Sequence, residues 1–142
     1  MTSHLLRGDP VSTIRTAADT IRTLVGALPE RARSEWACDL GIVWAPRGTP
    51  IVQARAWRDD ADRHAIGALI ATVASPDVAA ALADLLDALA WWRQAITSGD
   101  DMSVALAVNR VHATGDSLAD AITRKHTPTP AARATTRARR TR

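Results

Sequence analysis

Phenylalanine and tyrosine are absent from the 142 residues, and cysteine and lysine each occur once, as Cys38 and Lys125. A single cysteine excludes an internal disulfide and a zinc cluster of several cysteines, so we expect Cys38 to be a small buried side chain. Apolar residues still make up 46% of the chain, mainly Ala, Val, Leu and Ile together with five tryptophans. This share is enough for the core of one domain.

Long apolar runs and catalytic motifs are also missing. No run approaches the ~20 residues of a transmembrane helix, and residues 1–10 lack the apolar stretch of a signal peptide. We therefore predict a cytoplasmic protein without a transmembrane segment. The sequence contains no phosphate-binding GxxxxGKS/T loop, GxGxxG turn, HExxH pair or GxSxG elbow.

The titratable side chains form no constellation typical of a metal centre or an active site. None of the four histidines is spaced like a metal ligand with another histidine or with the cysteine. These histidines are His4, His64, His112 and His126. The densest acidic group, Asp59, Asp60 and Asp62, is typical of a solvated helix N-terminus. We predict a protein that is not an enzyme and has no metal and no cofactor.

The first half of the chain combines helical and strand patterns. Asp9-Pro10 is typical of a helix N-cap followed by the first helical residue, and apolar residues then recur at helical spacing over 14–28. A short polar helix is expected over 30–36. Strand-like runs separated by a Pro-Arg-Gly-Thr turn predict a β-hairpin at about 38–57. Two strands alone are marginal in water, so we expect this hairpin to pack on helices.

The second half predicts three helices. The first ends before Pro76, and Ser75-Pro76 is typical of the start of the next. Its apolar residues step by four and three: Val78, Leu82, Leu85, Leu89, Trp92 and Ile96. The last helix repeats these steps with Val104, Val108, Val111, Gly115, Leu118 and Ile122. Because a short link with a glycine joins the two helices, we predict an antiparallel hairpin with these residues facing one another.

Gly115 leaves two interpretations open for the last helix. Either one bent helix continues through the glycine, which close approach to Leu85 would justify, or the helix breaks and Asp116 caps a new one. We favour one helix because the apolar spacing continues. The predicted fold is thus mainly α, with an antiparallel helical hairpin, two helices before it and one small β-hairpin packed on them. It forms a single domain over 1–125, followed by a disordered basic tail over 126–142.

Basic charge is concentrated at the end of the chain. The last 22 residues contain seven basic residues and no acidic residue, whereas the first 120 contain 11 of the 18 basic residues and all 15 acidic ones. The seven are Arg124, Lys125, Arg133, Arg137, Arg139, Arg140 and Arg142. Such a segment binds nucleic-acid phosphates, an anionic lipid surface or an acidic protein, or serves only as a solvated tail. Nucleic acid, DNA in particular, is the interpretation we favour.

Trp91 is the second candidate for a contact site. Trp92 belongs to the predicted apolar seam, whereas its neighbour Trp91 points away from it. We expect Trp91 to pack under the β-hairpin or the first helix; an exposed Trp91 would instead indicate a partner-binding surface. The remaining tryptophans flank or lie in the hairpin and are expected to anchor it on the helices. They are Trp36, Trp44 and Trp57.

The order of these features resembles small accessory proteins of mobile elements. The segment from His64 to Leu89, with Ala-Ser-Pro-Asp-Val at 74–78 before spaced leucines, resembles the phage Ead-like proteins. The Ala- and Arg-rich composition, typical of GC-rich codons, and the arginine tail resemble the small spread proteins of actinobacterial conjugative plasmids. The resemblance implies a role in plasmid transfer or maintenance and supplies no catalytic residue.

Together these observations predict a non-enzymatic accessory protein of an actinobacterial plasmid or phage. It would act by contact with DNA, or with a protein such as the transfer machinery, through its basic tail. The alternative is a helical interaction or assembly module, self-associating or binding a partner at Trp91, without nucleic-acid binding.

Overall fold

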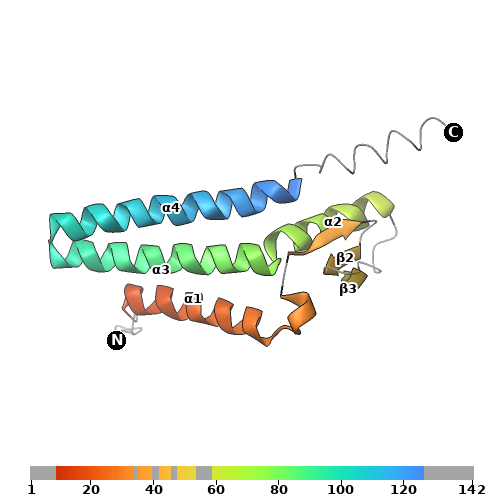
Figure 1. Cartoon of the computed structure of the whole chain (residues 1–142), viewed down its shortest axis with the longest axis horizontal. Coiled ribbons are helices and arrows are strands. Elements are labelled where there is room, and N and C mark those ends of the chain that lie inside the picture. Colours follow the sequence, from red (N-terminus) through yellow and green to blue (C-terminus); the bar gives the residue numbers. More distant parts are fainter. Residues whose placement is uncertain (1–8, 34, 40–41, 46–47, 54–58, 127–142) are drawn as a thin grey trace, which may run out of the picture.

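The computed structural model describes residues 9–33, 35–39, 42–45, 48–53 and 59–126. The described part is mainly helical (Figure 1). Its α-helices are α1 (Pro10–Ala27), α2 (Asp60–Val73), α3 (Pro76–Ser98) and α4 (Asp101–His126). A short 3-10 helix, η1 (Glu30–Ala32), precedes the strands β1 (Ala37–Asp39), β2 (Ile42–Ala45) and β3 (Thr49–Gln53). The predicted fold class is confirmed.

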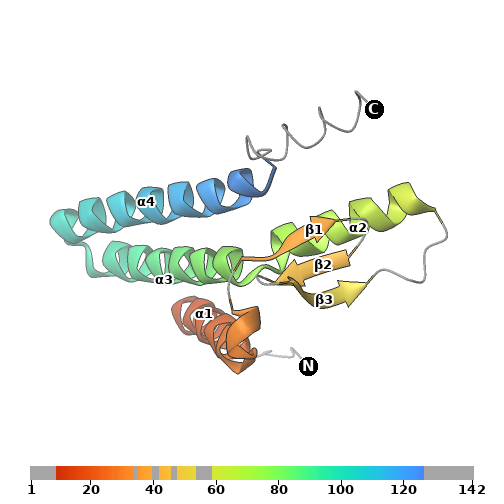
Figure 2. The same cartoon turned by 45° about the vertical axis from the view of Figure 1, so that its right-hand side comes forward.

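Helix α3 is the centre of the molecule. Helices α1 and α4 both pack along it, and α4 runs antiparallel to it. Figures 1 and 2 show α1 and α4 on opposite sides of α3, so the three helices form a layer one helix thick. The layer has two broad faces. In both views, no fourth long helix of the described residues covers either face.

The boundaries of the helices follow from their caps. Asp9 accepts hydrogen bonds from the backbone N–H groups of Val11 and Ser12, both at 3.3 Å, and so satisfies two free donors at the start of α1. Gly99 ends α3 with φ of 69°, a left-handed conformation that glycine adopts without strain. Asp100 then accepts from the N–H of Ser103 at 3.1 Å and opens α4.

Helix α4 is continuous through Gly115, as the favoured interpretation predicts. The expectation that Gly115 lies in close approach to Leu85 is wrong, however. A Cβ placed on Gly115 would meet nothing within 4 Å. The glycine is therefore not required by packing within the chain.

Alanine fills most of the centre of the helix contacts, and of the larger predicted seam residues Val78 is buried there, at 4% exposure. The residues buried to 5% exposure or less in the three-helix layer include Ala18, Ala83, Ala88, Ala90, Ala95, Ala107 and Ala121. By contrast, Leu82, Ile96 and Ile122 of the predicted seam are 38%, 50% and 37% exposed. Small side chains let helix axes approach closely, and the larger residues beside them then lie at the edge of the contact.

The strands form a three-stranded antiparallel sheet in the order β1-β2-β3. The β2–β3 pair is the predicted hairpin, and β1, which pairs with β2, extends it by one strand that the sequence did not predict. The sheet packs on α2 (Figure 2) around a small core of Trp36, Val43, Ala45 and Ala71. Packing of the hairpin on a helix and the anchoring role of Trp36 are thus confirmed. Trp44 is half-buried and does not belong to this core, and Trp57 lies outside the described residues.

Ser75 connects the sheet to the helical layer. Its hydroxyl makes no cap hydrogen bond to α3; instead it accepts from the backbone N–H of Trp36 at 2.9 Å and donates to the Asp77 carboxylate. Ser75 is fully buried. Because a buried polar group is costly unless it is hydrogen-bonded, this pair of contacts fixes β1 to the start of α3.

Two further expectations, one on Cys38 and one on a short helix, are only partly met. Cys38 is only partly buried, against the core under the sheet, and its thiol contacts the carbonyl oxygen of His64 at 3.8 Å. The polar helix expected over 30–36 is shorter than predicted and comprises only η1.

No single helix among the described residues has the length and apolar character needed to cross a bilayer. Helices α2 and α3 meet that test only as a pair, by length and composition, and they are bent by 46° at the break between them.

Candidate functional site

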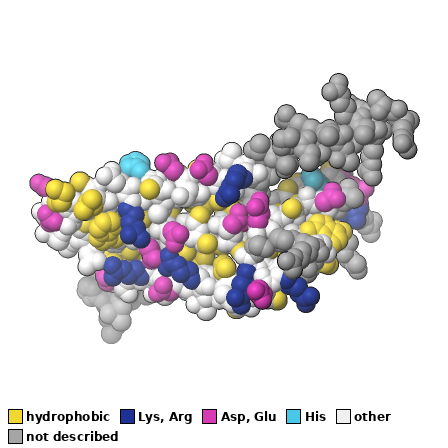
Figure 3. Space-filling view, in the orientation of Figure 1, with side chains coloured by type: hydrophobic (Ala, Val, Ile, Leu, Met, Phe, Trp, Pro, Cys, Tyr) yellow, Lys and Arg dark blue, Asp and Glu magenta, His cyan; other side chains and the backbone are white. Residues whose placement is uncertain are grey.

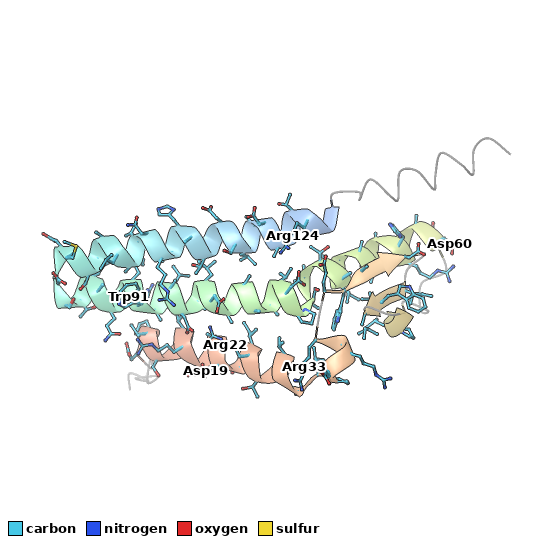
Figure 4. The ribbon with its side chains drawn as sticks, viewed as in Figure 1. Asp19, Arg22, Arg33, Asp60, Trp91 and Arg124 are labelled. Atoms are coloured by element: carbon cyan, nitrogen blue, oxygen red, sulfur yellow. The ribbon has the colours of Figure 1, made fainter. Side chains whose placement is uncertain are left out.

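The basic segment begins on the last turn of α4. Arg124 is exposed there (Figure 4), and its Nε donates to the carbonyl oxygen of Asp120 at 3.4 Å. Lys125 lies on the same turn, and positive charge at a helix C-terminus is favourable because the helix dipole is negative there. Five predicted contact residues lie outside the described residues: Arg133, Arg137, Arg139, Arg140 and Arg142.

Trp91 contacts α4. The guanidinium carbon of Arg110 lies 5.8 Å from the centre of the Trp91 ring, within the range of a cation–π interaction. The side chain is half-buried, so full exposure is excluded, and the residues one turn before and after it on α3, Asp87 and Gln94, bond to Arg22 and Arg15 of α1. The antiparallel pairing of the two helices already places Trp91 opposite Asn109 and Arg110, and this signal was overlooked.

One face of the helical layer carries a network of charges between α1 and α3. Arg22 donates to Asp84 at 2.9 Å and contacts Asp87 at 2.6 Å and Asp19 at 3.8 Å. The hydrogen bond to Asp84, followed by that to Asp87, raises the pKa of Arg22 above its usual value. Figure 4 labels Asp19 and Arg22 on α1, and Figure 3 shows acidic and basic side chains side by side on this face. Sequence analysis did not identify this network.

An apolar pocket of about 250 Å³ opens between α3 and α4. Its lining residues are Leu89, Trp92, Val108, Val111 and His112. The pocket brings together two pairs that the seam predicted, Trp92 with Val108 and Leu89 with Val111. Of the lining residues, His112 alone can titrate, so this pocket does not present a pair of acid and base groups.

The histidines and carboxylates do not converge in the described part of the chain. His64 on α2 and His112 on α4 are both exposed. Within the described ranges, no group of three His, Cys, Asp or Glu side chains lies close enough to hold a metal ion. The acidic group at the start of α2 is an N-terminal cap instead, since Asp59 accepts from the N–H of Ala61 at 2.7 Å.

Comparison with models of protein families, with curated proteins and with solved structures gives no match for this chain. The resemblance to phage and plasmid accessory proteins therefore stays a prediction from the sequence.

Proposed function

We propose that this protein is a non-enzymatic accessory protein that contacts double-stranded DNA through the basic segment, residues 124–142, in the transfer or maintenance of a plasmid or phage. The observation that carries the proposal is the distribution of charge. Seven basic residues and no acidic residue lie in the last 22 positions, while the first 120 residues have four more acidic than basic side chains.

This distribution favours contact through the segment alone. DNA phosphates release condensed counterions when Arg and Lys neutralise them, and this release drives binding without reading the base sequence. An acidic body is repelled by DNA, so it does not compete with the segment for the phosphates. We therefore expect weak sequence preference and a strong dependence on salt.

The experiment measures duplex binding against salt concentration for the full chain and for three variants. One variant ends at Thr123, and one ends at His126 and so keeps the complete α4. The third keeps the full length but has glutamine in place of the five arginines after residue 126. If all seven cations contact phosphates, the logarithm of the binding constant falls against the logarithm of salt with a slope of about −6.

The full-length variant with five glutamines shows whether the charge or the length of the segment causes DNA binding. We expect it to bind like the chain that ends at His126, with a slope shallower by up to about 4.5 because five cations are lost. Arg31→Gln is the matched control, because Arg31 is an exposed cation of the body, and it should bind like the full chain. Equal binding by all the chains would remove the segment from the mechanism and favour the interaction module without nucleic-acid binding.

A further inference from the structure

The two faces of the α1–α3–α4 layer differ in chemistry. One face holds the Arg22 network and the stacked pair of Arg110 and Trp91; Figure 4 labels Arg22 and Trp91, and Figure 3 shows charged side chains from the same side. An α-helix turns by 100° per residue, so two residues along a helix correspond to about half a turn. Leu24 is two residues after Arg22 on α1, and Leu82 is two residues before Asp84 on α3. Both leucines therefore point toward the opposite face.

The opposite face is mainly apolar, with Arg93 on α3 and Asp101 on α4 as charged residues. On α3, Leu82, Leu89 and Ile96 recur every seven residues, and on α4 Val108, Gly115 and Ile122 do the same. The pocket shared by Leu89 and Val108 shows that these two stripes lie on the same side of the layer. The side chains are open to solvent, since Leu24, Leu82, Ile96 and Ile122 are 64%, 38%, 50% and 37% exposed.

The size of this apolar face is that of a protein interface. Helix α1 has 18 residues and is thus about 27 Å long, and three helices packed side by side span about 25 Å, so the footprint of the layer is roughly 700 Å². A standard interface covers about 600–1,000 Å² on each partner.

We propose that this apolar face binds a second copy of the chain, with α3 antiparallel to α3 of that copy and a twofold axis at Leu89. Leu82 and Ile96 lie seven residues before and after Leu89, so this axis places Leu82 against Ile96 of the partner subunit. A twofold interface must be complementary to itself, and a spacing that is symmetric about one residue meets that requirement.

The charges around the face favour a second copy over a membrane. Membrane-surface helices have a rim of Lys and Arg, whereas the α4 stripe begins with Asp101, seven residues before Val108, and Asp116 follows Gly115; both carboxylates repel anionic lipid. Arg93 is the one charged side chain among the α3 positions on this side, between Leu89 and Ile96. The proposal is independent of the basic segment.

The experiment measures the mass of the full chain in solution by sedimentation over a roughly hundredfold range of concentration, with dimer as the expected species. Leu82→Glu and Ile96→Lys should each raise the dimer dissociation constant at least about tenfold, because each leaves a charge against an apolar side chain. Leu106→Glu is the matched control. Leu106 is 53% exposed but lies two residues, or 200°, from Val108, so this variant should dimerise like the wild type.

Combining the two substitutions tests the geometry. Leu82 and Ile96 are about 21 Å apart within one chain, too far to pair. In the proposed dimer the glutamate introduced at position 82 of each copy would face the lysine introduced at position 96 of the other. The double variant should therefore dimerise more tightly than either single variant. The like-charged double variant, Leu82→Lys with Ile96→Lys, should stay monomeric. Far-UV circular dichroism checks that every variant is folded.

Several outcomes would overturn the proposal. A monomeric wild type at every concentration excludes the dimer. An oligomer that Leu82→Glu does not weaken is formed through another surface, and a double variant no better than its parents excludes the antiparallel pairing. Binding of a monomeric wild type to vesicles with anionic lipid, lost in Leu82→Glu, would assign the face to a membrane.

Discussion

Two glycines of the α3–α4 hairpin differ in the reason for their presence. Gly99 has a φ of 69°, in the left-handed region where a Cβ is strained, and it ends α3. Gly115 lies inside α4, where a Cβ would have open space. Glycine in a helix interior is unfavourable because it loses more conformational freedom on folding than alanine does. The first glycine therefore shapes the turn, and the second weakens the helix.

We expect Gly115→Ala to raise the free energy of unfolding by about 1 kcal/mol, the difference in helix propensity between the two residues. Gly99→Ala should have the opposite effect and lower it, because alanine at a positive φ is strained. Urea denaturation of the three proteins at low concentration measures both changes. A Gly115→Ala variant less stable than the wild type would show that packing requires the glycine after all.

At the scale of single helices, α3 is packed through alanines on two of its sides. Ala83 and Ala90 share a stripe with Asp87, which contacts Arg22 of α1, and both alanines are fully buried. Buried alanine has no room for a larger side chain unless the helices separate. The distance between α1 and α3 is thus set by these small residues.

Enlarging one of these alanines tests that packing. Ala83→Leu should lower the free energy of unfolding by about 1–3 kcal/mol, the usual cost of overpacking a tight contact. Ala80→Leu makes the same chemical change at an exposed position of α3 and should be nearly neutral. Thermal and urea denaturation compare the two; equal effects of both substitutions would refute the tight contact at Ala83.

The start of α4 depends on the charge of Asp100. The hydroxyl and the N–H of Ser103 donate to this carboxylate and lower its pKa below the usual value. A lowered folded-state pKa means that the charged form stabilises the fold above the unfolded-state pKa of about 3.9, and that this stability is lost as the pH falls through the folded-state value.

Asp100→Asn isolates that charge, because asparagine is an equally good cap. We expect the wild type to have the higher urea midpoint at pH 7 and the difference between the two proteins to shrink at acid pH below about 4. Urea midpoints of the wild type and of Asp100→Asn, measured from pH 7 down to acid pH, test this expectation. A difference that does not change with pH would mean that the charge of Asp100 plays no part in the cap.

The sequence predicted the helices well because each has local signals at its ends. Asp9, Pro76 and Gly99 act at short range, so their caps and breaks can be read without knowing the fold. Strand β1 was missed because its three residues, 37–39, have little strand character of their own and become a strand by pairing with β2. Which side of α3 is buried was also beyond local reasoning, since it depends on two neighbouring helices.

The candidate contact residues were predictable to different degrees. The basic segment follows from a count of charges. The partner of Trp91 follows from the antiparallel pairing, which places Arg110 opposite it. The apolar face was not foreseen because Leu82 and Ile96 have the spacing of core residues, and a periodic pattern does not tell a buried stripe from an exposed one.

At the scale of the whole molecule, the two proposed surfaces do not overlap. The apolar face belongs to α1, α3 and α4, and the basic segment begins at the C-terminal turn of α4. A dimer formed through the face would therefore carry two basic segments, each free to contact phosphates. Two linked binding segments hold DNA more tightly than one, because the second binds at a raised effective concentration. Assembly and DNA contact would then support one another without sharing a residue.

The dimer also predicts how stability depends on concentration. When folding and association are linked, raising the protein concentration tenfold adds about 1.4 kcal/mol to the apparent stability of the dimer. The urea midpoint of the wild type should therefore rise with protein concentration, whereas that of Leu82→Glu should not. Truncation at His126 should leave the concentration dependence intact, because α4 and the apolar face remain complete. A wild-type midpoint independent of concentration would mean that the layer is stable alone with its apolar face open to water.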